Sequence, residues 1–221
     1  MAVGGYRKAS DLPLVIPVFP LDGALLLPGG LLPLNIFEPR YLNMIDDAMA
    51  GDRMIGMIQT REGGDRERPN IVTIGCAGRI TSFAETQDGR YLVSLTGVCR
   101  FEVVAELGLP TPYRQVRADF SRFEGDLRDP EEPPPEARPA LFDALKRYLD
   151  RRGLAMDWEA ANDAPLEALV NSLAAALPFD PAEKQALLEA ADPEERRFAL
   201  IALMQIDSAG PMGDDVPPSM Q

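Results

Sequence analysis

A run of three prolines near the middle of the chain constrains the fold more than any other feature of the sequence. These prolines, residues 133–135, lie within the acidic segment 123–138. Consecutive prolines fit neither a helix interior nor a central strand, because each lacks an N–H donor and has a fixed φ angle. The sequence therefore predicts an extended, solvated, proline-rich acidic linker over residues 123–138, with one folded unit on each side.

The half that precedes this linker has the residue pattern of a β-rich domain. Short apolar runs bounded by Pro or Gly are typical of buried strands. We expect strands at such runs over residues 14–19, 31–37, 54–58, 70–85, 90–106 and 113–120, a helix over 40–50 and a loop over 61–68. Glycines inside the runs favour bulges, which a sheet needs to curl toward closure. Residues 1–122 are thus predicted to form a small, partly closed β-barrel domain.

The half that follows the linker has helical periodicity and clear helix starts. Two segments, Asp180-Pro181-Ala182-Glu183 and Asp192-Pro193-Glu194-Glu195, each place Asp at an N-cap, Pro at the first helical position and Glu at the third. Apolar residues recur at helical spacing in the rest of this half. We expect a small bundle of four helices over residues 139–206 and a disordered tail over 207–221, which makes the chain an α+β protein.

The charge and the absence of histidine exclude several classes of function. The chain has 35 acidic and 22 basic residues, a net charge of −13, and no histidine. It therefore lacks the commonest general base and zinc ligand, and every Ser-His or Cys-His nucleophile. A net negative charge also disfavours nonspecific binding to nucleic acid, because phosphate contacts need clustered Lys and Arg. This second argument is weaker for residues 1–120, which are nearly neutral with 14 acidic and 12 basic residues.

The remaining residues form no catalytic or cofactor motif. No phosphate loop and no Gly-x-Ser-x-Gly element is present. Helix capping explains the acidic clusters, so we expect no metal and no other cofactor. Cys76 and Cys99 lie in apolar, strand-like contexts typical of buried, reduced thiols, although neighbouring strands would allow them to pair. Because no transmembrane helix or signal peptide is indicated, we expect a cytoplasmic protein that does not bind membranes.

An apolar segment over residues 25–33 has two interpretations. In one, its leucines fill the core of the β-domain on either side of a tight turn. In the other, part of the segment stays exposed and forms an apolar lip that receives another polypeptide. The candidate substrate-binding residues of this segment are Leu25, Leu26, Leu27, Leu31 and Leu32.

Motifs in both halves, taken in order, resemble the N-terminal (substrate-binding) domain of Lon proteases. They are Ile16-Pro17-Val18-Phe19-Pro20-Leu21, Leu27-Pro28-Gly29, and the segments 32–41, 74–80, 95–101, 177–179 and 183–189. The resemblance implies a PUA-like β-barrel followed by a helical bundle. It assigns structural roles, in turns and packing, to the matching positions Pro20, Leu21, Pro28, Gly75, Gly97 and Arg100.

In full-length Lon proteases this domain recognises substrate polypeptides and precedes an ATPase module and a Ser-Lys protease. The sequence ends at Gln221 with neither module, so we expect a stand-alone, non-catalytic protein. The expected partners are unfolded or flexible polypeptides, together with protease or chaperone components in protein quality control.

Two other functions are alternatives to polypeptide binding. One is nucleic-acid or nucleotide binding, because PUA-like barrels include RNA binders. It is disfavoured because the first half has no basic cluster beyond Arg61, Arg66 and Arg68. The other is an unrecognised hydrolase, which no motif supports.

Overall fold

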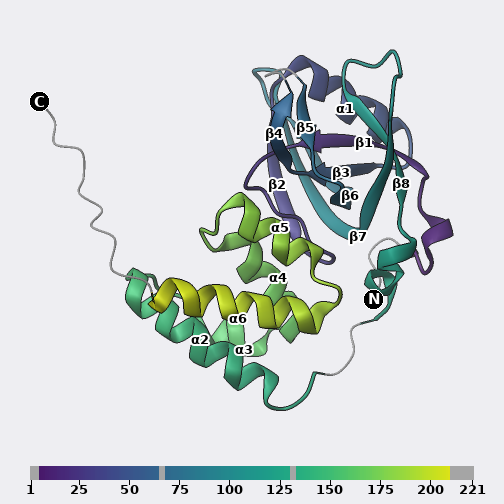
Figure 1. Cartoon of the computed structure of the whole chain (residues 1–221). Helices are drawn as coiled ribbons and strands as arrows, with labels where there is room; N and C mark the ends of the chain where they lie inside the picture. Colours follow the sequence, from purple (N-terminus) through teal and green to yellow (C-terminus); the bar gives the residue numbers. More distant parts are fainter. Residues whose placement is uncertain (1–4, 65–67, 130–132, 210–221) are drawn as a thin grey trace, which may run out of the picture.

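The computed structural model describes residues 5–64, 68–129 and 133–209, and it confirms the predicted α+β class with a partly closed sheet (Figure 1). The strands are β1 (Val15–Pro20), β2 (Leu31–Ile36), β3 (Met54–Ile58), β4 (Thr60–Gly64), β5 (Pro69–Ile71), β6 (Ile74–Glu85), β7 (Tyr91–Leu107) and β8 (Arg114–Asp119). The α-helices are α1 (Pro39–Ala50), α2 (Ala137–Arg152), α3 (Trp158–Asp163), α4 (Leu166–Ala176), α5 (Pro181–Glu189) and α6 (Pro193–Ala209). Two short 3-10 helices are η2 (Ala9–Asp11) and η3 (Ser121–Leu127).

Six strands form one sheet in the order β2-β7-β6-β3-β1-β8, and this sheet curls until β8 also pairs with β7. The length of β7 makes the closure possible, because residues 91–96 pair with β2 whereas residues 102–107 pair with β8. Register shifts between Ala77 and Gly78 and between Ile80 and Ser82 mark bulges in the β6–β7 pair, as the strand glycines predict. Closure stays partial because β2 pairs only with β7 and lies at the edge of the sheet.

Two segments, one in the first half and one at the start of the predicted linker, contain secondary structure that we did not expect. The stretch 61–68, expected as a loop, contains most of β4, which pairs with β5 in a second small sheet. Residues 121–127 form η3, and two of its side chains, Phe123 and Leu127, are buried. The expectation of an extended linker from residue 123 onward is therefore wrong up to residue 127. The three prolines at 133–135 are exposed, as predicted.

The described part of the second half contains five α-helices, where we expected four. The additional helix α3 has six residues, too few for a recognisable apolar stripe, and it begins at Asp157, which accepts hydrogen bonds from the first-turn amides. The predicted start at Asp180 is confirmed, because Asp180 and Glu183 accept hydrogen bonds from each other's amides at 2.8 Å. Helix α6 includes residues 207–209, where we expected the tail, and the rest of that tail, 210–221, lies outside the described residues.

The helices of the second half gather on one side of the curled sheet. Figure 1 shows α2 to α6 together, with α6 alongside α2, while α1 lies at the far end of the β-domain. The loop between β1 and β2 reaches toward this helical side. Within the described residues, no helix has the length and apolar character needed to cross a bilayer.

Close backbone approach explains why a glycine occupies position 97. The N–H of Gly97 donates to the carbonyl oxygen of Gly30 at 2.9 Å, and the carbonyl of Gly97 accepts from the N–H of Gly29 at 2.9 Å. A Cβ atom at this position would lie 2.0 Å from the carbonyl oxygen of Leu27. Gly97 therefore lets the β1–β2 loop lie directly against β7.

The substitution Gly97→Ala is expected to lower the free energy of unfolding by about 2 kcal/mol or more, because the added methyl group overlaps the Leu27 carbonyl. Chemical denaturation measures the change. The matched control is Gly125→Ala, where a Cβ atom would meet nothing within 4 Å. Equal losses in the two variants would contradict the close-approach explanation.

Candidate functional site

The five candidate leucines fall into two groups, three in the β1–β2 loop and two on strand β2. Leu25, Leu26 and Leu27 are buried in the core, so these three side chains do not line an exposed lip and the core interpretation is correct for them. Gly78 makes room for one of them, because a Cβ atom there would lie 2.6 Å from Cδ2 of Leu26. The last two leucines lie on strand β2, where Leu31 is 66% exposed and Leu32 is half-buried.

An exposed, uncharged face extends from Leu31 across β2 and β7. Residues 31, 33 and 35 of β2 pair with residues 96, 94 and 92 of β7. On β7 the alternate side chains Val93 and Leu95 are buried, so residues 92, 94 and 96 point to the opposite, outer surface. We call this surface the outer β2–β7 face; its residues are Leu31, Pro33, Asn35, Leu92, Ser94 and Thr96.

Leu31 and Leu92 give the outer β2–β7 face its apolar character. Leu92 is 47% exposed, and no residue of the paired segments 31–36 and 91–96 carries a charge. Leu92 is not among the residues predicted to bind, because it lies inside a strand that we expected to be buried. The alternation of Leu92, Ser94 and Thr96 with Val93 and Leu95 is the signal that distinguishes the outer face.

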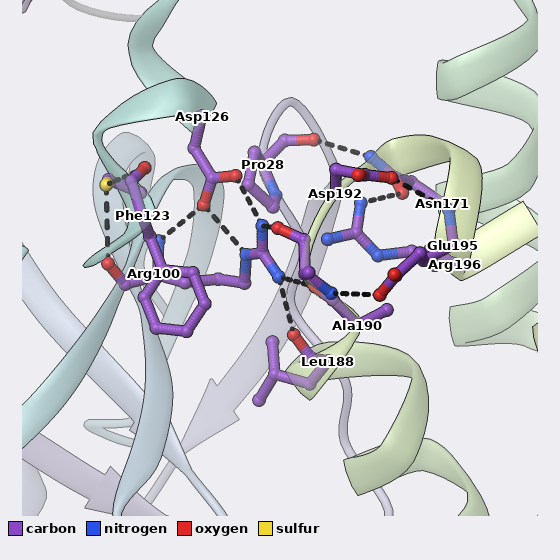
Figure 2. A network of polar contacts seen from close by, with 12 residues as sticks. Pro28, Arg100, Phe123, Asp126, Asn171, Leu188, Ala190, Asp192, Glu195 and Arg196 are labelled. Atoms are coloured by element: carbon purple, nitrogen blue, oxygen red, sulfur yellow. Dashed lines mark hydrogen bonds and ion pairs between the residues drawn. The ribbon is translucent and has the colours of Figure 1, made fainter.

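Arg100 connects the sheet to the helical half through a buried network (Figure 2). From β7, its guanidinium donates to both carboxylate oxygens of Asp126 in η3, at 2.9 and 2.8 Å. Its Nη1 also donates to the carbonyl oxygen of Leu188 at 3.0 Å and to that of Ala190, at the C-terminal end of α5. The side chains of Arg100 and Asp126 are only 2% and 6% exposed. A cation is favourable at this position, because the last carbonyls of a helix carry partial negative charge.

A second buried arginine adds hydrogen bonds to this contact between the sheet and the helical half. Nε of Arg196, in α6, donates to the carbonyl oxygen of Leu187 at 3.0 Å, and Nη1 donates to Oδ1 of Asn171 at 3.0 Å. Nδ2 of Asn171 in turn donates to the carbonyl oxygen of Pro28 in the β1–β2 loop at 2.9 Å (Figure 2). Burial and the nearby Arg100 lower the pKa of Arg196 to about 10, so this guanidinium remains charged at neutral pH.

Two further residues of α5 contact the β-domain. Nζ of Lys184 donates to the carbonyl oxygen of Gly23 at 2.8 Å, and burial lowers the pKa of this amine. Nε2 of Gln185 donates to the carbonyl oxygen of Ile74 at 3.2 Å. The helical half therefore meets β6, β7 and the β1–β2 loop through specific polar contacts.

Some of the matching family positions lie at strand ends or make close backbone contacts. Pro20 ends β1, and the N–H of Leu21 donates to the carbonyl oxygen of Ile58 at 2.9 Å. A Cβ atom at Gly75 would lie 2.6 Å from the carbonyl oxygen of Met57. Asp126, Asn171 and Arg196 were missed, because their partners are distant in the sequence.

The described residues contain no candidate metal site, and their two cysteines are buried. No group of three or more Cys, Asp or Glu side chains in residues 5–64, 68–129 and 133–209 is arranged to hold a metal ion. Cys76 and Cys99 lie on the paired strands β6 and β7 but are free thiols. Burial raises the pKa of both thiols far above the ordinary value, which suppresses the reactive thiolate.

Comparisons of the sequence with protein families give one match over most of the chain. Residues 15–205 match the family described as the ATP-dependent protease La (LON) substrate-binding domain. Lon protease 2 of Myxococcus xanthus is 29% identical over 92% of this chain and 25% of that protein. The Lon protease of Anaeromyxobacter dehalogenans is 26% identical over 88% of this chain and 23% of that protein. The chain therefore spans about a quarter of the length of these relatives.

Solved structures share the fold. The Lon N-terminal domain protein from Xanthomonas campestris aligns with a TM-score of 0.61 and 24% identity, covering 85% of this chain and 97% of that chain. The N-terminal domain of the Mycobacterium avium complex Lon protease aligns with a TM-score of 0.62 and 20% identity, covering 86% of this chain and 98% of that chain.

Removing the Arg100 charge is expected to destabilise the protein strongly. Arg100→Ala leaves the buried Asp126 carboxylate unpaired and the end of α5 uncapped, so we expect a loss of about 3 to 5 kcal/mol in the free energy of unfolding. The control is Arg90→Ala, which breaks the exposed pair with Asp88 and should cost less than about 1 kcal/mol. Similar losses in both variants would show that the buried network does not hold the halves together.

The two thiols are expected to resist alkylation in the folded protein, because both are buried and their pKa values are raised. Treatment with iodoacetamide at pH 8 followed by mass spectrometry should find both cysteines unmodified, and both labelled once denaturant is added. Rapid labelling of either thiol without denaturant would contradict the burial described for β6 and β7.

Proposed function

The chain belongs to the ATP-dependent protease La (LON) substrate-binding domain family, and on this basis we propose that it binds unfolded or flexible segments of other polypeptides without catalysing a reaction on them. The observation that carries this proposal is the outer β2–β7 face, where Leu31 and Leu92 are exposed on the paired segments 31–36 and 91–96, which contain no charged residue. Exposed apolar segments distinguish unfolded from folded proteins, and their burial against such a face is favourable by roughly 25 cal/mol per Å².

The non-catalytic part of the proposal is supported by the chemistry of the described residues. The chain has no histidine, and its two thiols are buried with raised pKa values. The family match also concerns the substrate-binding domain. A protein of this kind would act as an adaptor in protein quality control, presenting bound polypeptides to protease or chaperone components. Its free thiols fit a reducing compartment such as the cytoplasm.

Nucleic-acid binding gains no support from the basic residues that the sequence singles out. Of these, Arg66 lies outside the described residues, and Arg68 forms an ion pair with Glu106 at 2.5 Å. The same glutamate also pairs with Arg114 at 2.7 Å. The positive charge of this hairpin is therefore partly neutralised.

Binding to a permanently unfolded, carboxymethylated model protein tests the proposal. The double variant Leu31→Asp, Leu92→Asp places two charges on the outer β2–β7 face and is expected to weaken binding by about tenfold or more, measured by isothermal titration calorimetry. Both side chains are exposed, so the fold should be retained. The matched control Val104→Asp, Ile206→Asp adds the same charge at two other exposed apolar positions and should bind as the unmodified protein does.

Two outcomes would contradict the proposal. If the unmodified protein has no measurable affinity for the unfolded model protein, polypeptide binding is wrong. If both double variants weaken binding equally, net charge and not the outer β2–β7 face governs the interaction.

A further inference from the structure

The mode of binding can be inferred from the backbone of β2, which has a free edge. The sheet order places β2 at one end, and β8, at the other end, closes onto β7. Among the strands of the six-stranded sheet as described, β2 is therefore the one whose second edge has no partner strand. An edge strand presents a row of N–H and C=O groups that can pair with another extended chain.

The register shows which backbone groups of β2 point away from the sheet. The N–H of Gly97 donates to the carbonyl oxygen of Gly30, so this pair of residues is hydrogen-bonded. Hydrogen-bonding direction alternates along an antiparallel strand, which directs residues 32, 34 and 36 toward β7 and residues 31, 33 and 35 outward. Pro33 agrees with this assignment, because an outward position is where a strand tolerates a residue without an N–H.

Leu31 and Asn35 therefore offer an outward N–H and C=O each, and Pro33 offers a C=O. No hydrogen bond joins these five groups to another residue within 5–64, 68–129 and 133–209. The two donors and three acceptors recur every two residues, except for the N–H that Pro33 lacks, and this is the repeat of an incoming strand. The same three residues place their side chains on the outer β2–β7 face, so backbone pairing and apolar contact occur side by side.

We propose that the polypeptide bound by this protein adds to the sheet as a strand along the free edge of β2. This inference rests on the proposed function and specifies the substrate as an extended, uncharged segment. The charge distribution supports that choice, because the β2–β7 segments 31–36 and 91–96 contain no charged residue in a chain of net charge −13. A charged side chain on the incoming strand would find no opposite charge on residues 31–36 of β2. Main-chain hydrogen bonds give affinity with little dependence on sequence, as binding to diverse unfolded segments requires.

Backbone methylation of a peptide tests this mode directly. The probe is a fluorescent peptide of six residues, the length of β2, that alternates valine and threonine. Two isomers of this peptide are compared. One carries N-methyl groups on its odd-numbered amides and the other carries them on its even-numbered amides. An added strand directs only every second amide toward β2, so one isomer should lose affinity by about tenfold or more while the other retains most of it.

A protein variant tests the same contact from the other side. Asn35→Pro removes one outward N–H without removing a bond to β7, and it should weaken binding of the probe and of the unfolded model protein by about fivefold to tenfold. Asn35→Ala removes the side chain and keeps the N–H, so binding should change less than about twofold. Circular dichroism establishes that Asn35→Pro is folded, and the methylated peptides supply the test if it is not.

The outcomes separate this inference from the proposed function. If the unfolded model protein binds but both methylated isomers bind equally, or the unmodified probe does not bind at all, strand addition is wrong and polypeptide binding stands. If neither the probe nor the model protein binds, the proposed function fails. If sedimentation shows a dimer that Asn35→Pro dissociates, the edge is occupied by a second copy of the chain and the inference is overturned.

Discussion

The contact between Arg100 and the end of α5 decides how the two halves of this protein are joined. A helix that ends inside a protein leaves carbonyl groups that need donors, and here two buried arginines supply them. Arg100 reaches the carbonyls of Leu188 and Ala190, and Arg196 reaches that of Leu187. Asp126 neutralises Arg100 and draws η3 onto β7 in the same contact. The sheet, the segment leading to the prolines and the helical half thus meet at one buried network, in which removing Asp126 or Arg100 would leave its partner's charge uncompensated.

The contact between the two halves also determines which edge of the sheet remains unpaired. The β1–β2 loop lies between β7 and the helices, fixed by Gly97 on one side and by Asn171 on the other. Its leucines at 25–27 are therefore buried in the core. The strand that follows, β2, pairs with β7 from its first residue, Leu31. Because β8 closes the sheet onto β7 and not onto β2, no strand within the described residues pairs with the other edge of β2. The free edge and the exposed Leu31 follow from the same closure of the sheet.

The sequence predicts well the features that depend on neighbouring residues. The capping box at Asp180 and the apolar runs that become strands are local features, and their positions agree with the structure. The partners of Arg100 are not local, since Asp126 lies 26 residues away and Leu188 lies 88 residues away. Composition cannot separate the buried Leu27 from the exposed Leu31, because strand pairing and not hydrophobicity makes the difference. Asp126 was misread for the same reason, as one acidic residue of a solvated linker.

Amide hydrogen exchange measures most directly whether a polypeptide pairs with the outward backbone of β2. In the free protein the amides of Leu31 and Asn35 should exchange quickly, because no described residue accepts from them. With a saturating concentration of an unfolded model protein, these two amides should become protected, while those of Leu32 and Leu34, already bonded to β7, should change little. Protection that appears on another surface, with Leu31 and Asn35 exchanging as before, would contradict the account.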